Sequence, residues 1–534
     1  MNFGFVIDNR NCIGCHACTV ACKSEHDVPV GVNRTWVKYV EKGVFPNTRR
    51  LFSVMRCNHC ENAPCVEICP TRALYTREDG IVDFDNRRCI ACKACTQACP
   101  YDAIYIDPQS HTAAKCNYCA HRVEMNLEPA CVNVCPTQAI ISGNLDDPNS
   151  RISQLVSRQQ VTVRKPEKGT RPKLFYVEGD ESSLTPGMAG QDNRYLWSSQ
   201  VRGVGHHAAE RDDEQERFAK VLGEASEALD SIRNYIQTEN QPATRASGAK
   251  RVYDAPAKGV MWGWEVAAYI LTKAVAAGMV MVPFLAYLFG ESTDSTPLGF
   301  AAWVALLFLG ATGVLLIKDL DQPTRFLYVL FRPNWSSWLV KGAYIITAYG
   351  GLLTLWILLD WIGASWLANA IGLLLTGLGA LTALYTGFLF NQAKGRDLWQ
   401  SPLMPVHMLI HALIAGPAVW LVLAQLSDSM DTLSGPMSYT LLFGLLAQLL
   451  ILAAEVWSHH PTEDSHRAVH LIAHGPYRQT FWRYGVGLGS VLPLLLLVAS
   501  FEPLVLVLAA GLSLFGLWHL VRLWVQVPQL IPLS

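Results

Sequence analysis

The placement of the cysteines constrains this chain more than any other feature. All 16 cysteines lie before residue 136 of the 534 residues, and they fall into four groups of four. The groups are Cys12, Cys15, Cys18 and Cys22; Cys57, Cys60, Cys65 and Cys69; Cys89, Cys92, Cys95 and Cys99; and Cys116, Cys119, Cys131 and Cys135. Proline follows the last cysteine of every group except the first, where Lys23 follows it. The first third of the chain must therefore fold around whatever its thiols bind.

The spacing of the thiols indicates iron–sulfur clusters. The third group, CIACKACTQACP, has the pattern C-x2-C-x2-C-x3-C-P of bacterial ferredoxins, in which the fourth cysteine binds the other cluster of a pair. Disulfides are disfavoured because cysteines two residues apart give poor bridge geometry, and we expect no secretory signal before them. Structural zinc usually joins two separate C-x2-C pairs, whereas three cysteines crowd within seven residues in two of these groups. We therefore predict iron–sulfur ligation.

The composition divides the chain into a polar and an apolar half. The net charge is −1, and most charged residues lie in the first half. Without a basic stripe or tail, we expect no binding to nucleic acid. The sequence pattern of residues 205–236, within a polar stretch, predicts one charged amphipathic helix. We expect a ferredoxin-like α+β domain at 1–180, a polar and partly helical linker at 181–258, and an all-α membrane domain at 259–534.

The apolar half contains stretches of about 20 residues, the length that a helix needs to cross a bilayer. We predict eight transmembrane helices, at residues 266–289, 298–317, 340–359, 367–389, 403–426, 437–457, 484–500 and 503–524. An even number of spans places the entrance to the first helix and the C-terminus on the same side of the membrane.

The loops distinguish the two sides of the predicted bundle. Those on the side of the N-terminus and the last exit carry Lys318, Arg325, Arg332, Lys341, Lys394, Arg396, Arg467, Arg478, Arg483 and Arg522. The opposite loops, GESTDSTP, DWIGAS, LSDSMDTLSG and FEP, carry no lysine or arginine. Because short basic loops stay in the cytoplasm, we expect an inner-membrane protein with both termini and the cysteine domain in the cytoplasm. The N-terminal MNFGFVIDNRNC, which has no hydrophobic signal core or twin arginine, agrees.

Two family resemblances follow from these motifs. The four cysteine groups, with the long gap in the fourth, resemble the iron–sulfur subunit of the DMSO reductase family of molybdenum enzymes. PTQAIISGNLDDPNSRISQLV and KPEKGTRPKLFYV are similar to the end of that subunit, so the resemblance covers about residues 1–178. The stretches KDLDQPTRFLYVLFRPNWSSWLVKGAYIITAYGG and GPYRQTFWRYGVGLGSVLPLLL, with the helix count, resemble the NrfD-type membrane anchor of polysulfide reductase. These are normally two proteins, and the two resemblances imply that they are fused in this chain.

The resemblance implies that electrons pass between a molybdopterin catalytic subunit and membrane quinone, menaquinone or ubiquinone, through four 4Fe–4S clusters. It implies crossed ligation, first group with fourth and second with third. The implied ligand sets are Cys12, Cys15, Cys18 and Cys135; Cys116, Cys119, Cys131 and Cys22; Cys57, Cys60, Cys65 and Cys99; and Cys89, Cys92, Cys95 and Cys69. The substrate site belongs to the partner, so we expect no catalytic residue here.

Ionisable residues in the predicted spans are candidates for a quinone site, because such residues are costly inside a bilayer. They are Lys273, Asp319, His407, His411 and Glu455, all expected toward the cytoplasmic side. Each has a structural alternative: Lys273 could snorkel or pair, and Asp319 could cap a helix or bridge to Arg325. His407 or His411 could ligate a haem together with His519, but the resembling anchors carry none, so we expect no haem.

Three functions fit this sequence. The first is the electron-relay and quinone-reacting subunit of a cytoplasm-facing molybdenum enzyme, with a sulfite:quinone oxidoreductase favoured over a reductase of polysulfide, DMSO or a similar acceptor. The second is the same relay with another partner, such as a formate dehydrogenase or a thiol/disulfide reductase. The third is a proton translocator, for which Lys273 and Glu455 are suited. The sequence leaves the direction of electron flow open.

Overall fold

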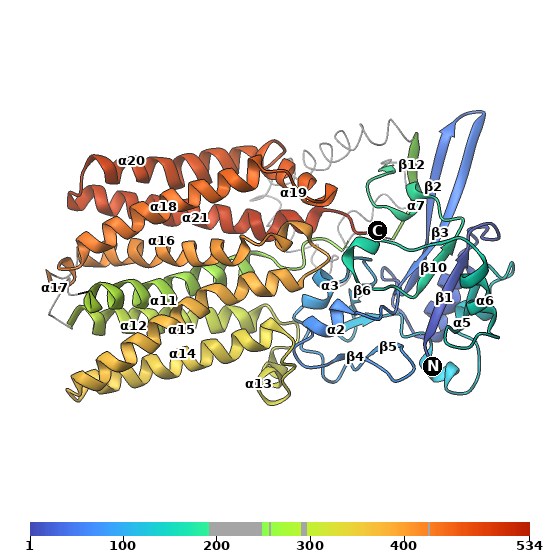
Figure 1. Cartoon of the computed structure of the whole chain (residues 1–534), viewed down its shortest axis with the longest axis horizontal. Coiled ribbons are helices and arrows are strands. Elements are labelled where there is room, and N and C mark those ends of the chain that lie inside the picture. The colour runs from blue at the N-terminus through green and yellow to red at the C-terminus, as the bar shows by residue number, and fades with distance from the viewer. Residues whose placement is uncertain (192–247, 256–257, 290–295, 426–427) are drawn as a thin grey trace, which may run out of the picture. The chain divides into compact units, whose positions relative to one another are not determined.

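A computed structural model describes residues 1–191, 248–255, 258–289, 296–425 and 428–534 (Figure 1). The chain divides into two compact units. The first comprises Met1–Met261, Ala393–Gly395 and Pro532–Ser534, and the second Trp262–Gln392 and Arg396–Ile531. The helix predicted at residues 205–236, in the expected linker, lies outside the described residues.

The first unit combines small sheets with short helices. Its described strands are β1 (Phe3–Asp8), β2 (Thr35–Val44), β3 (Asn47–Arg56), β4 (Leu74–Thr76), β5 (Val82–Phe84), β6 (Ile104–Ile106), β7 (Ala113–Lys115), β8 (Ile140–Asn144), β9 (Val161–Thr162), β10 (Leu174–Val177), β11 (Gly190–Gln191) and β12 (Ala249–Tyr253). They form sheets in the order β8-β1-β10-β9 and β11-β12-β2-β3, with two further pairs, β4-β5 and β6-β7. Strand β1 pairs parallel with β10 and antiparallel with β8, so both ends of the cysteine-bearing segment meet in one sheet.

The short helices of this unit lie at the cysteine groups and just after them. They are α1 (Ala17–Glu25), α2 (Pro64–Ile68), α3 (Ala94–Ala98), α4 (Ala120–Val123), α5 (Ala130–Asn133), α6 (Arg151–Arg158) and α7 (Glu181–Leu184), with the 3-10 turn η1 (Pro166–Lys168). Helices α1, α2, α3 and α5 each contain at least one cysteine, and Cys119 is the residue before α4. Five of the cysteines, Cys18, Cys22, Cys65, Cys95 and Cys131, therefore project from helices.

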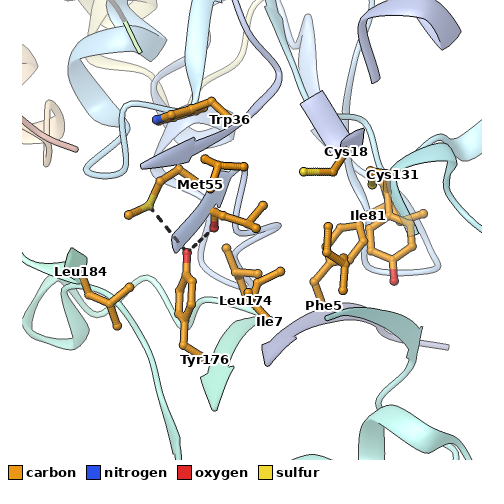
Figure 2. Close-up of a cluster of buried hydrophobic side chains, with 14 residues drawn as sticks. Phe5, Ile7, Cys18, Trp36, Met55, Ile81, Cys131, Leu174, Tyr176 and Leu184 are labelled. Carbon is orange, nitrogen blue, oxygen red and sulfur yellow. Dashed lines mark hydrogen bonds between the residues drawn. The ribbon is translucent and has the colours of Figure 1, made fainter. Parts of the chain in front are cut away.

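A compact core holds the two larger sheets together (Figure 2). Phe5 and Ile7 of β1 pack in the same cluster as Trp36 of β2 and Met55 of β3. The Tyr176 hydroxyl donates a hydrogen bond of 2.9 Å to the Val54 carbonyl, which satisfies its only polar group in an apolar setting. Two of the cysteines, Cys18 and Cys131, belong to this core, so burial of apolar surface also buries their thiols.

The second unit is a bundle of apolar helices. The longer ones are α11 (Trp264–Leu288), α12 (Thr296–Lys318), α14 (Trp338–Trp361), α15 (Ser365–Gln392), α16 (Met404–Ala424), α18 (Ser434–Trp457), the π-helix η4 (Thr480–Val491) continued by α20 (Leu492–Ala499), and α21 (Pro503–Gln526). Shorter elements are α13 (Tyr328–Phe331), α17 (Asp428–Asp431), α19 (Glu463–Ala473), η2 (Pro323–Arg325), η3 (Asp397–Gln400) and η5 (Val527–Leu530). Eight helices in the described ranges are long and apolar enough to cross a membrane, as the sequence predicted.

Several spans begin a few residues earlier than predicted, and the start of the seventh differs most. The seventh helix starts at Thr480 rather than at residue 484, with a π-helical segment that includes Arg483. The predicted span began only after Arg483, because a charged residue interrupts the apolar stretch. A long arginine side chain at a helix end can, however, keep its head group in water.

Helix α11 is the centre of the bundle and packs against α12, α15, α16 and α21. At Gly278 the helix passes so close to α16 that an added Cβ would lie 2.1 Å from the Ala412 carbonyl oxygen. Outer helices such as α12 expose large apolar side chains, among them Trp303 and Leu307. The polar residues of α11 and α16 therefore lie in the interior, whereas the apolar outer surface suits lipid.

Candidate functional site

The cysteine loops share one backbone feature. In each group the residue before the second cysteine has a positive φ: Gly14 (70°), His59 (43°), Ala91 (54°) and Tyr118 (63°). A left-handed residue reverses the chain within the C-x2-C segment. The two thiols of each pair can then face the same space, as a shared cluster requires.

Thiols from the second and third groups line two hollows in the first unit. One is lined by Cys89, Cys92 and Cys95 of the third group together with Cys69 of the second. The other is lined by Cys57, Cys60 and Cys65 of the second group together with Cys99 of the third. Each hollow thus joins three thiols of one group to the last thiol of the other.

The placement of Cys69 and Cys99, each in the hollow of the other group, has a structural cause. Cys69 and Cys99 are the residues directly after α2 and α3, and both have extended backbone angles. Helices α2 and α3 pack against each other. The chain leaves each helix toward the neighbouring group, and the proline that follows prevents the helix from continuing.

Thiols from the first and fourth groups are also brought together. The Cys12 thiol is close enough to the thiols of Cys15 and Cys135 for their charges to interact. Cys22 has Cys116, Cys119 and Cys131 as its electrostatic neighbours, and α1 packs against α5. Cys18 approaches thiols of both sets, Cys12 and Cys131, so the two sets are adjacent.

The donor sets fit cubane clusters. Among the described residues, no three His, Cys, Asp or Glu side chains form a site for a single metal ion, whereas two sets of four thiols line hollows. Burial raises the pKa of the Cys18 thiol to about 12 against the opposing charge of Arg56, and bound iron would stabilise the thiolate further. Backbone N–H groups already point at sulfur, including those of Leu74 toward Cys69 and Ala139 toward Cys135, at 3.4 and 3.3 Å.

In the membrane unit, Lys273 of α11 is fully enclosed by protein. Its side chain is 1% exposed, and Nζ donates hydrogen bonds to the Ala383 carbonyl at 3.1 Å and to Thr386 Oγ1 at 2.5 Å. The ammonium group also lies 4.4 Å from the centre of the Tyr385 ring, a favourable cation–π contact. Lys273 therefore pairs with α15 and does not snorkel to the surface.

Two histidines of α16 lie near this lysine. His407 and His411 are each 5% exposed, with ring centres 6.0 Å apart, and His411 lies within electrostatic reach of Lys273. Among the described residues, His407 Nε2 and His411 Nδ1 are buried without a hydrogen-bond partner. A buried unpaired nitrogen is costly, and either an ordered water or a polar group of a ligand would satisfy it.

The remaining candidates lie at helix ends. Asp319 directly follows α12, is half-buried, and lies within electrostatic reach of Tyr269 on α11. Glu455, near the end of α18, is 5% exposed and accepts a hydrogen bond of 2.6 Å from Ser401. His519 packs against Phe515 and Tyr484, while the His407 ring stacks on Trp524. The polar candidates are thus spread over several helices, and among them His407, His411 and Lys273 are linked by the contacts described above.

Comparison with known proteins identifies both halves of the chain. Models of the 4Fe-4S dicluster domain match residues 11–74 and 48–145. The model of the polysulphide reductase NrfD family matches residues 254–528, just over half of the chain. The protein belongs to the NrfD polysulphide reductase family. Its eight apolar helices make it an integral membrane protein.

The iron–sulfur half of this NrfD-family chain has curated relatives of its own. A tetrathionate reductase subunit of Salmonella typhimurium is 44% identical over 199 residues, which cover 36% of this chain and 79% of that protein. A polysulfide reductase component of Wolinella succinogenes is 43% identical over 187 residues, 34% of this chain and 97% of that protein. A putative dimethyl sulfoxide reductase iron-sulfur subunit of Halobacterium salinarum is 35% identical over 277 residues, 46% of this chain and 98% of that protein. The fusion predicted from the motifs is confirmed.

The structure of this NrfD-family chain also reveals buried cations that the sequence analysis missed. Arg56 is fully buried, stacks 4.3 Å from the centre of the Phe5 ring, and has Cys18, Cys116 and Cys131 as electrostatic neighbours. Lys115, also buried, donates a 2.8 Å hydrogen bond to the Cys116 carbonyl. A positive charge beside a cluster favours its more negative, reduced form and so raises its potential.

A sequence signal for these cations exists. A basic residue directly precedes the first cysteine of three groups, in the pairs Arg56–Cys57, Arg88–Cys89 and Lys115–Cys116. No sequence signal marks Tyr385 and Thr386 of α15 as the neighbours of Lys273, because both are ordinary residues of an apolar helix.

Proposed function

We propose that this chain is the electron-transfer and membrane-anchor subunit of an oxidoreductase, linking a molybdopterin catalytic subunit to the membrane quinone pool. The observation that carries the proposal is the exchange of Cys69 and Cys99 between two thiol-lined hollows, in a chain that also spans a membrane. The names of the three relatives, each a component of a reductase, support a catalytic partner.

Four 4Fe–4S clusters would carry the electrons, each by taking up and releasing one electron. The proposed ligand sets are Cys12, Cys15, Cys18 and Cys135; Cys116, Cys119, Cys131 and Cys22; Cys57, Cys60, Cys65 and Cys99; and Cys89, Cys92, Cys95 and Cys69. The residues of this chain supply thiolates, N–H donors to sulfur, and the charges of Arg56 and Lys115.

The substrate belongs to the partner, and two reactions are candidates. Oxidation of sulfite, with electrons passed to quinone, fits the predicted cytoplasmic position of the cysteine domain. Reduction of polysulfide, DMSO or a similar acceptor with electrons from quinol is favoured by the names of the relatives. Isolation of the complex tests both: we expect a large partner that contains molybdenum and supports one of these reactions with quinone. A partner without molybdenum would refute this assignment.

For the quinone we propose a site formed by Lys273, His407, His411, Asp319 and Glu455. The unpaired nitrogens of His407 and His411 would hydrogen-bond the quinone oxygens, and Lys273 would place positive charge where negative charge develops. Asp319 and Glu455 would exchange protons with the ring, because each quinone reduced by two electrons also takes up two protons.

The Lys273→Met variant tests this site. We expect electron exchange between clusters and quinone to slow by roughly 10²-fold, since one charge that stabilises the reduced ring is lost. Turnover with an artificial dye that takes electrons directly from the clusters should persist. Lys318→Met is the matched control, because Lys318 lies at the exposed end of α12 beside Glu265. A normal quinone-linked rate in Lys273→Met would make Lys273 structural.

We further propose that the cysteine domain and both termini lie in the cytoplasm, on the evidence of the basic loops. A reporter that is active only in the cytoplasm should be active when fused after Ser534 and inactive when inserted near Ser292. The reverse pattern of reporter activity would place the clusters on the outer side of the membrane.

A further inference from the structure

A row of histidines follows α18. The segment SHHPTEDSHRAVHLIAH contains His460, His466, His470 and His474, the last three spaced by four residues along α19 and its end. Their ring centres are 6.5, 6.3 and 5.0 Å apart in that order. The spacing of four places the α19 rings on one helix face. The capping hydrogen bond from Ser465 N to Thr462 Oγ1 at 3.2 Å fixes the turn between His460 and α19.

The row connects the interior of the bundle with its surface. At the inner end, His460 Nε2 is buried and, among the described residues, has no hydrogen-bond partner. His460 lies within electrostatic reach of the buried Glu455 carboxylate. His466, the next residue of the row, is exposed, and so is His474 at the outer end.

We propose that His460, His466, His470 and His474 form a proton relay between solvent and Glu455. The relay rests on the proposed quinone site and adds its proton path. Reduction of one quinone consumes two electrons, which the clusters deliver, and two protons, which the relay delivers to Glu455. Oxidation of quinol releases the same electrons and protons in the opposite direction.

The chemistry of the row suits this role. Imidazole ordinarily has a pKa near 6.5, so at neutral pH it both accepts and donates protons. The ring centres are 5.0 to 6.5 Å apart, so a proton can pass between neighbouring histidines through a direct hydrogen bond or one bridging water. Charged side chains near the row include Glu463, Asp464 and Arg467 of α19, and the adjacent η3 and η4 carry Asp397 and Arg483. Arg467 is paired with Glu463 at 3.1 Å, so its charge is partly offset.

The His460→Gln variant tests the inner step. The full chain is placed in liposomes with quinone, its clusters are reduced by a reduced viologen dye, and quinol formation is followed in a weakly buffered medium. We expect the rate to fall at least tenfold and to recover when free imidazole is added, because imidazole can replace the missing proton carrier. His459→Gln, which removes the exposed neighbouring histidine outside the row, should keep the wild-type rate.

Zinc tests the outer end. Two histidines four residues apart on a helix can chelate Zn²⁺, so Zn²⁺ should slow quinol formation by the wild type and Mg²⁺ should not. The double variant His470→Gln, His474→Gln should lose the sensitivity to Zn²⁺. A His460→Gln variant with the wild-type rate, or with a slow rate that imidazole does not restore, would overturn the relay alone. A wild-type chain that reduces no quinone would overturn the proposed function and the relay together.

Discussion

The Cys99→Ser variant is expected to disrupt the cluster of the second cysteine group and to leave that of its own group intact. Cys99 lines the hollow of Cys57, Cys60 and Cys65, whereas Cys92 lines the hollow that contains Cys69. Serine is a poor ligand for iron, so that cluster should be lost or reduced to three irons. The iron content of the purified chain should fall below its expected value of about sixteen, four per cube.

Electron paramagnetic resonance of the reduced chain assigns the loss to one cluster. Cys99→Ser should alter the same signal as Cys60→Ser and leave the signal altered by Cys92→Ser unchanged. By the same reasoning, Cys22→Ser and Cys119→Ser should alter one common signal, and Cys15→Ser should alter a different one. If Cys99→Ser and Cys92→Ser alter one common signal, ligation is not crossed.

The Gly278→Val variant is expected to prevent stable folding of the membrane unit. A Cβ at residue 278 would lie 2.1 Å from the Ala412 carbonyl oxygen and 2.9 Å from Gly416 Cα. Both are backbone atoms of α16 and cannot rotate away, so α11 and α16 would have to separate. Overpacking of this kind costs about 3 kcal/mol or more. We expect little folded protein in detergent, measured by size-exclusion chromatography and thermal unfolding.

Gly310→Val provides the control for this variant. It makes the same substitution within a membrane helix, on α12, but no atom lies within 4 Å of its added Cβ. Its yield and its melting temperature should stay close to those of the wild type. Equal stability of the two variants would mean that the contact between α11 and α16 is not close.

Much of this protein follows from local sequence patterns. The spacing within CIACKACTQACP predicts turns that face thiols toward one another, since only a few residues separate the ligands. Long apolar stretches predict the eight membrane helices, because a helix must bury its polar backbone wherever it lies in lipid. Several predicted boundaries differ from the observed ones by a few residues, and the start of the seventh helix, where Arg483 interrupts the apolar stretch, differs by four.

The partners of these residues were decided by tertiary structure. Cys69 and Cys99 change places because α2 packs on α3, and nothing within either motif specifies that contact. Lys273 meets Tyr385 and Thr386 because small residues let α11 approach its neighbours closely. Sequence by itself determined which groups can bind metal or titrate, since that is a property of the side chain and its near neighbours. Tertiary structure decided which of those groups share a site, because helices distant in sequence meet only when the apolar faces between them pack.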